Sequence, residues 1–225
     1  NTWSASFGDS IDVVVSNNDG MGMSMFNAWS KDNGVPTFGY DANSDAVAAI
    51  AEGYGGTISQ HADVQAYLTL RVLRNALDGV DINTGISTAD DAGNVLSESE
   101  YVYNEEERSF YALNVAVTAD NYEDYLDSTV TFAAVSNQLD AEAHPTKNVW
   151  LNIYSAADNF LSATYQPLLQ KYDDLLNLNV EYIGGDGQTE ANITNRLSNP
   201  NDYDAFAINM VKTDNSASYT ALLNQ

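Results

Sequence analysis

Residues 149–183 read VWLNIYSAADNFLSATYQPLLQKYDDLLNLNVEYI, and this stretch decides the fold. An apolar run at 149–154 precedes a stretch with helical spacing of its apolar residues at 159–172, and a second apolar run follows at 178–183. Short apolar runs of this kind predict strands that are buried on both faces of a sheet. Two strands joined through one helix predict a parallel pair with a right-handed crossover. The sequence therefore predicts an α/β fold with mostly parallel sheets.

The same alternation of strands and helices extends in both directions along the chain. Further strands are predicted at residues 11–16, 35–40, 56–59, 110–117 and 204–209. Further helices are predicted at residues 19–30, 44–51, 62–77, 188–197 and 216–223, with Ser44 as one N-cap. Residues 78–109 are rich in turn-forming residues, and residues 130–145 have no helical period. We expect an irregular excursion at the first of these segments and a linker at the second.

Composition excludes several classes of function. The 225 residues contain 8 Lys and Arg against 32 Asp and Glu, a formal net charge of -24 that repels nucleic acids. The absence of cysteine excludes disulfides, thiolate zinc sites and cysteine nucleophiles. The only histidines, His61 and His144, are far apart in sequence, which disfavours a histidine metal site or a serine–histidine–aspartate triad. No apolar run reaches the roughly 18 residues that a membrane-spanning helix needs.

Polar residues follow the predicted strands at the ends where ligands of parallel α/β sheets bind. They include Asn18, Asp41, Gln60 and Asp158, and an aromatic ring, Phe160, follows the last of these. Carboxylates and carboxamides match the vicinal hydroxyls of a sugar, and an aromatic ring covers its apolar C–H face. The Gly-rich and Lys-containing phosphate motifs are absent. Asp158, Asp19 and Ser44 are equally well explained as helix caps.

Several of these stretches resemble the bacterial galactose/glucose-binding proteins, which are periplasmic sugar receptors of ABC transporters. The resemblance is carried by DVVVSNNDGMGM at 12–23, VPTFGYD at 35–41, GGTI at 55–58, NVAVTADN at 114–121, IYSAADNFL at 153–161 and AFAINMV at 205–211. It covers most of residues 8–77, 110–126 and 147–223. It implies a periplasmic-binding-protein-like fold of two Rossmann-like domains with a ligand cleft between them, incomplete in this chain.

The resemblance also implies a set of ligand-binding residues. These are Asn18, Asp41, Gln60, Tyr154, Asp158 and Phe160. By analogy Asp158 bonds a sugar hydroxyl, Phe160 stacks on one face of the ring, and Asn18 and Asp41 take further hydroxyls. Gln60 stands where the galactose/glucose receptors have Asn, and ribose receptors are similar to this chain in using Gln. The identity of the sugar therefore stays open, and no catalytic or metal-binding role is expected for these residues.

The order of the segments differs from that of the family. Residues 1–129 resemble the family's C-terminal half, which contributes to both lobes, and residues 147–225 resemble its N-terminal lobe. Residues 130–146 are predicted to be a linker or an original N-terminal extension. The family's middle stretch, which carries its calcium loop, has no counterpart, so no cofactor is expected. Three origins of this order stay open: a circular permutation with a deletion, a sequence given out of its native order, and a natural rearrangement. A permuted chain or a sequence given out of its native order is favoured.

The expected function is that of a non-enzymatic extracytoplasmic protein that binds a monosaccharide, glucose or galactose or a similar hexose, for uptake. Its expected partners are that sugar, an ABC permease and a chemoreceptor, with no nucleic acid. The expected location is periplasmic or extracellular. One version of this expectation is a lipoprotein that a lipid anchor, at an N-terminus removed from this sequence, tethers to the membrane. Two alternatives stay open. One is the sugar-sensing effector domain of a transcription regulator, and the other is a glycosidase that uses Asp41 and Asp158 as a carboxylate pair.

Overall fold

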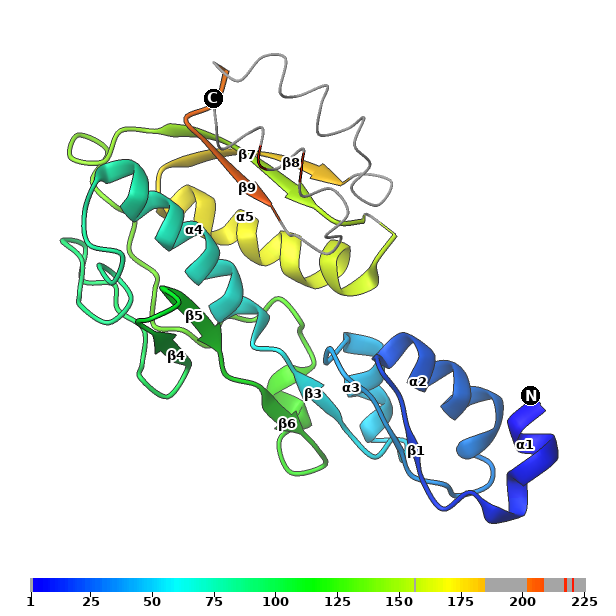
Figure 1. Ribbon diagram of the computed structural model, residues 1–225. Helices are drawn as coiled ribbons and strands as arrows, with labels where there is room; N and C mark the ends of the chain where they lie inside the picture. Colours follow the sequence, from blue (N-terminus) through cyan, green and yellow to red (C-terminus); the bar gives the residue numbers. More distant parts are fainter. Residues whose placement is uncertain (1, 156, 185–201, 209–216, 218–219, 221–225) are drawn as a thin grey trace. The chain divides into compact units, whose positions relative to one another are not determined.

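The computed structural model describes residues 2–155, 157–184, 202–208, 217 and 220 (Figure 1). The chain divides into two compact units. Unit 1 consists of Asn1–Ala62 and Val102–Val130, and unit 2 consists of Asp63–Tyr101 and Thr131–Gln225. Both units combine helices with parallel strands, as the alternation in the sequence predicts.

Unit 1 is built on two strand pairs that a bridge joins into one small sheet. β1 (Val14–Val15) pairs in parallel with β2 (Thr37–Phe38), and a parallel bridge joins Phe38 to Gly56 just before β3 (Thr57–Ser59). β3 in turn pairs in antiparallel orientation with β6 (Val115–Val117). The three parallel strands therefore end at one edge of the sheet.

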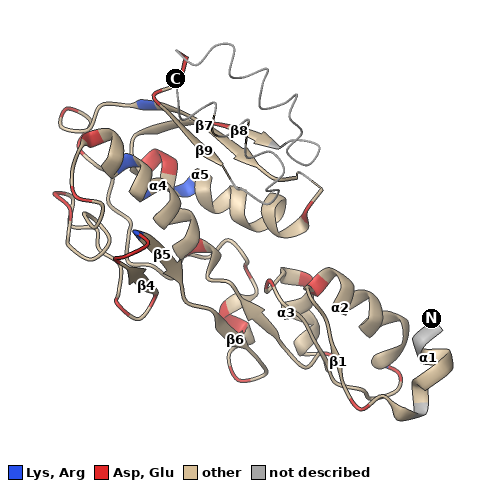
Figure 2. Cartoon of the chain, in the orientation of Figure 1, with Lys and Arg blue, Asp and Glu red and all other residues tan. Residues whose placement is uncertain are grey.

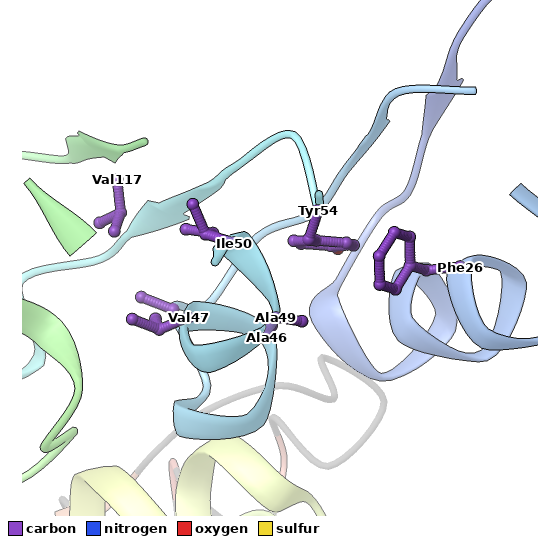
Figure 3. Close-up of a cluster of buried hydrophobic side chains, with 8 residues drawn as sticks. Phe26, Ala46, Val47, Ala49, Ile50, Tyr54 and Val117 are labelled. Atoms are coloured by element: carbon purple, nitrogen blue, oxygen red, sulfur yellow. The ribbon is translucent and has the colours of Figure 1, made fainter. Parts of the chain in front are cut away.

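The helices of unit 1 cover one face of this sheet. α2 (Asp19–Met25) continues into the π-helical turn η2 (Phe26–Ser30), and α3 (Ser44–Ile50) follows β2. Figure 3 shows the buried cluster that these elements share with Tyr54 and Val117. Its aromatic centre is an edge-to-face pair of Phe26 and Tyr54 with ring centroids 5.4 Å apart. Burial of these side chains is what holds the helices on the sheet.

The opposite face of β1 and β2 is open in the part of the chain that the structure describes. Val15 is 79% exposed, and its register partner Phe38 is 38% exposed. The prediction that residues 11–16 form a strand buried on both faces is therefore wrong. The other face of these two strands is buried. Thr37, the register partner of Val14, is fully enclosed there, and its hydroxyl forms a hydrogen bond of 2.6 Å with the Ser30 hydroxyl.

The remaining elements of unit 1 are short. α1 (Thr2–Phe7) and the 3-10 turn η1 (Gly8–Ser10) open the chain, and η3 (Tyr122–Tyr125) follows β6. β4 (Tyr101–Asn104) and β5 (Ser109–Ala112) pair with each other. The expected single strand at 110–117 is thus divided into β5 and β6, and part of the expected irregular excursion at 78–109 is the β4–β5 pair.

Unit 2 contains a three-stranded parallel sheet in the order β8–β7–β9. Its strands are β7 (Lys147–Ile153), β8 (Leu178–Gly184) and β9 (Ala205–Ile208). Leu151 of β7 lies beside Tyr182 of β8, and Trp150 lies beside Phe206 of β9. The parallel pair predicted from residues 149–183 is therefore confirmed, with β7 central as its apolar sequence demands.

One face of this sheet packs against α5 (Gln166–Leu175), which continues the π-helical turn η4 (Leu161–Tyr165). Tyr182 donates a hydrogen bond to Oδ2 of Asp173 on α5 at 2.6 Å, so Tyr182 and its neighbour Leu151 face this helix. α4 (Ala62–Asp78) runs beside α5 (Figure 1). The two helices meet through the rings of Tyr67 and Tyr172, with centroids 5.3 Å apart.

Irregular segments complete unit 2. Residues 131–146 contribute the buried side chains Ala133, Val135 and Leu139, and the Asp63 carboxylate accepts the backbone N–H groups of residues 132 and 133. The predicted linker is thus an ordered part of this unit. The helices predicted at 188–197 and 216–223 lie outside the described residues, apart from two isolated positions.

Buried charge fastens the turn-rich segment to α4. Arg71 and Asp90, each 1% exposed at the side chain, form an ion pair with N and O 2.8 Å apart. Arg74 pairs with Asp78 one helical turn below it. Figure 2 shows basic residues on α4 and acidic residues spread over loops and helices. Two of the eight Lys and Arg residues of this acidic chain are thus used in ion pairs inside unit 2.

Candidate functional site

The candidate site begins at the edge of unit 1 where β1, β2 and β3 end. Backbone hydrogen bonds hold the three ends together: the Asp19 N–H donates to the Tyr40 carbonyl at 2.8 Å, and the Asp41 N–H donates to the Ile58 carbonyl at 2.9 Å. The residues that follow these strands are therefore neighbours in space, as the parallel arrangement predicts.

Asp41 and Gln60 meet at this edge. Nε2 of Gln60 donates a hydrogen bond to Oδ1 of Asp41 at 2.6 Å, although the two residues are 19 positions apart in sequence. Both side chains are half-buried. The structure thus brings together two of the residues predicted to bind ligand, and it presents a carboxylate and a carboxamide side by side.

Asn18 also lies at this edge and has a structural task. Its Oδ1 accepts the N–H of Met21 at 2.9 Å, so Asn18 is the N-cap of α2. Ser44, in contrast, is not the cap of α3, because Asn43 occupies that position and makes no capping hydrogen bond through its side chain. The capping role predicted for Ser44 is therefore wrong by one residue.

The backbone at this edge adopts unusual conformations. Asp41 has φ of 114° and Ala42 has φ of 53°, directly after β2, and His61 has φ of 55° after β3. Positive φ in a residue other than glycine costs about 1–3 kcal/mol and persists where surrounding contacts enforce it. Three such residues after neighbouring strands indicate that the fold holds this edge in a specific shape.

A fully buried carboxylate, Asp19, lies beneath the edge. Its Oδ2 accepts the Asn43 N–H at 2.9 Å and the Thr57 hydroxyl at 3.0 Å, and its Oδ1 accepts the Tyr54 hydroxyl at 3.4 Å. Burial raises the pKa of Asp19 to about 6 and the charge of Asp41 adds to the rise, while the hydrogen bonds from Asn43 and Thr57 oppose it. The prediction that Asp19 is a helix cap is wrong, because Asn18 caps α2, and nothing in Asn17-Asn18-Asp19 indicates which side chain turns inward.

A second pair extends the polar edge. Nδ2 of Asn114 donates to the Tyr40 hydroxyl at 3.0 Å. Asn114 stands between β5 and β6, so a segment distant in sequence reaches the residue that precedes Asp41. This pair could not be predicted from the sequence, since an exposed Asn in a loop gives no signal of its own.

In unit 2, Asp158 lies at the carboxyl end of β7. Its Oδ1 accepts the Leu161 N–H at 2.9 Å, so it caps the helical segment that begins there. The carboxylate is exposed. The alternative reading of Asp158 as a helix cap is therefore confirmed, and it leaves a ligand-binding role for the same group untouched.

Phe160 and Tyr154 lie near Asp158 in the sequence and are half-buried. The ring of Phe160 stacks on Tyr165, with centroids 6.1 Å apart and an angle of 14° between the planes. The Tyr165 hydroxyl in turn bonds the Thr69 hydroxyl of α4 at 2.9 Å. The orientation of Phe160 is thus supported from beneath by a buried aromatic ring.

Within residues 2–155, 157–184 and 202–208, no three His, Asp or Glu side chains are grouped so that they could hold a metal ion. In the same part of the chain, no helix has the length and apolar character needed to cross a membrane.

Residues 146–216 match the family model described as periplasmic binding protein domain. The match starts next to β7 and spans β8 and β9, so it covers the parallel sheet of unit 2. It supports the broad family of periplasmic binding proteins, in agreement with the mixed helix and strand content and the parallel sheets.

Proposed function

We propose that this protein binds a monosaccharide outside the cytoplasm and delivers it for uptake without converting it chemically. The family match at 146–216 supports a small-molecule ligand, a binding role and a periplasmic location. The observation that carries the choice of a sugar is the Asp41–Gln60 pair at the strained edge of unit 1.

The chemistry of this edge favours hydroxyl groups. A carboxylate accepts two hydrogen bonds in its plane, and a carboxamide both donates and accepts, so the pair can bind two adjacent hydroxyls. No Lys or Arg stands among the described residues that directly follow β1, β2, β3 and β7. A phosphate or carboxylate ligand would lack a partner there and would meet the charge of Asp41.

In unit 2 we assign analogous roles to Asp158 and Phe160. Asp158 uses Oδ1 in the helix cap, and we propose that the carboxylate also accepts a sugar hydroxyl. Phe160 is stacked on Tyr165 by one face, and we propose that its other face covers the C–H groups of the sugar. Asn18 and Tyr154 complete the proposed ligand-binding set.

The finer parts of the proposal follow the resemblance in sequence. The ligand is a hexose similar to glucose or galactose, and an ABC permease and a chemoreceptor recognise the loaded protein. The protein resides in the periplasm or at the outer surface of the cell. A lipid anchor is one way in which it would be attached to the membrane there.

The proposal is tested by thermal unfolding with and without millimolar D-glucose, D-galactose, D-ribose and D-xylose. A ligand that binds only the folded protein raises the midpoint by an amount set by RT ln(1 + [L]/Kd). We expect one sugar to raise the midpoint in the wild type and in Asp45→Asn, an exposed position on α3, but not in Asp41→Asn. If unfolding is cooperative and no sugar raises its midpoint, monosaccharide binding is refuted. If the protein hydrolyses a nitrophenyl glycoside, it is an enzyme and the non-enzymatic role is refuted.

A further inference from the structure

Asp19 connects α2 to both of the segments that carry the ligand-binding pair. It is 0% exposed, and Oδ2 receives hydrogen bonds from the loop after β2, through the Asn43 N–H, and from β3, through the Thr57 hydroxyl. The Thr57 oxygen also accepts the Ala42 N–H at 3.2 Å. One buried carboxylate therefore fixes, directly or through Thr57, the two peptide N–H groups that follow Asp41.

These contacts coincide with the strained backbone. Asp41 and Ala42 have positive φ, and the N–H groups that Asp19 and Thr57 fix belong to Ala42 and Asn43. A strained conformation needs contacts that make the alternatives worse. Asp19 supplies such a contact because a buried carboxylate that lost its donors would carry a large desolvation penalty.

Asp19 and Tyr54 are closely packed against two glycines. A Cβ at Gly39 would lie 2.1 Å from Oδ1 of Asp19, and a Cβ at Gly22 would lie 2.3 Å from the Tyr54 hydroxyl. Both glycines therefore make space for the Asp19–Tyr54 contact. A carboxylate that needed only a helix-capping role would not require this space.

We propose that Asp19 is a positioning residue for ligand binding, whose buried carboxylate holds residues 41–43 in the conformation that presents Asp41 beside Gln60. This inference rests on the function proposed above for Asp41 and Gln60. It adds a residue that does not touch the ligand and acts through the Asn43 N–H and the Thr57 hydroxyl.

The test compares Asp19→Asn, Asp19→Ala and a control, Ser30→Ala. Asn can place its carbonyl oxygen at the Oδ2 position and accept the same two donors, whereas Ala accepts none. Ser30→Ala removes a buried hydrogen bond to Thr37 in the same unit, so it weakens unit 1 without touching residues 41–43. Two measurements are made: amide hydrogen exchange at 20 °C, and binding of the D-sugar that stabilises the wild type.

We expect amides 41–47 to exchange at least about tenfold faster in Asp19→Ala, with β7 amides unchanged, and near-normal exchange in Asp19→Asn. We expect sugar affinity to fall at least about tenfold in Asp19→Ala and to be retained in Asp19→Asn and Ser30→Ala. Unchanged exchange at 42 and 43 in Asp19→Ala, or equal loss of affinity in all three variants, overturns the inference. If the wild type binds none of the four sugars, the proposed function fails, while hydrogen exchange still decides whether Asp19 holds this loop.

Discussion

Nε2 of Gln60 lies 2.6 Å from Oδ1 of Asp41, so the residues that follow β3 and β2 form one polar pair. The pair depends on two adjacent parallel strands ending at the same level, because the Asp41 N–H is bonded to the Ile58 carbonyl. Asp41 carries the charge, and Gln60 fixes the direction in which one of its oxygens points. The two side chains are thereby held in a defined orientation before any ligand arrives, which reduces the entropy lost on binding.

Replacement of Gln60 by Leu tests this orienting role. Leu retains much of the volume but donates no hydrogen bond to Asp41, so we expect sugar affinity to fall about tenfold, the value of roughly one hydrogen bond to a charged group. The melting midpoint without sugar should hardly change, because Asp41 is half-buried and water can replace the lost donor. Isothermal titration calorimetry measures the first effect and circular dichroism the second.

The control for Gln60→Leu is Gln138→Leu. Gln138 in unit 2 donates to Oδ1 of Asn177 at 3.1 Å and to the Asp174 carbonyl at 3.2 Å, next to the amino ends of β7 and β8 rather than at their carboxyl ends. Gln138→Leu therefore removes comparable hydrogen bonds without altering Asp41. Equal affinities for Gln60→Leu and Gln138→Leu would exclude Gln60 from the binding site.

The parallel strands could be predicted from the sequence because their signals are local. The apolar runs at 149–154 and 178–183 correspond to β7 and β8, and the intervening helical spacing corresponds to η4 and α5. The strand ends then place Asp41 near Gln60 by topology alone. This part of the candidate site needs no knowledge of side-chain packing.

Other features depend on contacts between distant segments and could not be predicted. The run at 110–117 divides at Leu113 and Asn114, because β6 pairs with β3 while β5 pairs with β4. The exposure of Val15 depends on which face of the sheet the helices cover. The burial of Asp19 depends on Asn43, Tyr54 and Thr57, which are 24 to 38 positions away.

A double-mutant cycle tests the close packing around Tyr54. A Cβ at Gly22 would lie 2.3 Å from the Tyr54 hydroxyl, whereas the next nearest atoms are at 3.3 and 3.4 Å. We therefore expect Gly22→Ala to destabilise unit 1 by about 2 kcal/mol through overpacking. In the background of Tyr54→Phe the same change should be nearly neutral, since the clashing oxygen is gone and Ala favours a helix. Urea denaturation of the four proteins gives the coupling energy.

Gly39→Ala is the matched comparison for this cycle. Its Cβ would meet Oδ1 of Asp19 at 2.1 Å as well as the Tyr54 hydroxyl at 2.4 Å. Tyr54→Phe should therefore rescue Gly39→Ala much less than Gly22→Ala. Equal rescue at both positions would show that the Asp19 carboxylate moves freely, contrary to its hydrogen bonds.

The buried Arg71–Asp90 pair provides a third prediction. Nε of Arg71 also donates to the Thr84 carbonyl at 2.8 Å, and Oδ1 of Asp90 accepts the Asn94 N–H at 2.7 Å. Arg71→Met leaves the Asp90 charge buried without its partner, so we expect a loss of about 3–5 kcal/mol in the free energy of unfolding. Urea denaturation followed by circular dichroism measures it.

Neutralising Asp90 separates the charge from the packing in this region. In Arg71→Met/Asp90→Asn, neither side chain is charged, and we expect part of the lost stability to return. The exposed Lys31–Glu52 pair is the reference for an ion pair in solvent, and Lys31→Met should have a much smaller effect than Arg71→Met. If the double variant were as unstable as the sum of the single changes, the two charges would not be coupled.

His144 gives the last prediction, which concerns pH. Its Nδ1 lies 2.8 Å from Oδ2 of Asp78 and its Nε2 lies 3.0 Å from Oδ2 of Asp91, and Asp78 also pairs with Arg74. Burial lowers the pKa of His144, but the hydrogen bonds to both carboxylates outweigh burial and raise the pKa above 6.5. Only the imidazolium can donate to both carboxylates at once, since neutral imidazole has a single N–H.

A folded-state pKa above the unfolded value means that protonated His144 stabilises unit 2. This contribution is complete below the unfolded pKa near 6.5 and is lost as the pH rises through the folded pKa. We therefore expect His144→Gln to lower the free energy of unfolding more at pH 6 than at pH 9, as measured by urea denaturation. Asp91→Asn, which leaves Asp78 in place, should reduce this difference, because one of the two carboxylates that hold the proton is then neutral. An equal effect of His144→Gln at both pH values would mean that His144 is neutral in the folded protein and binds only one of the two carboxylates as a donor.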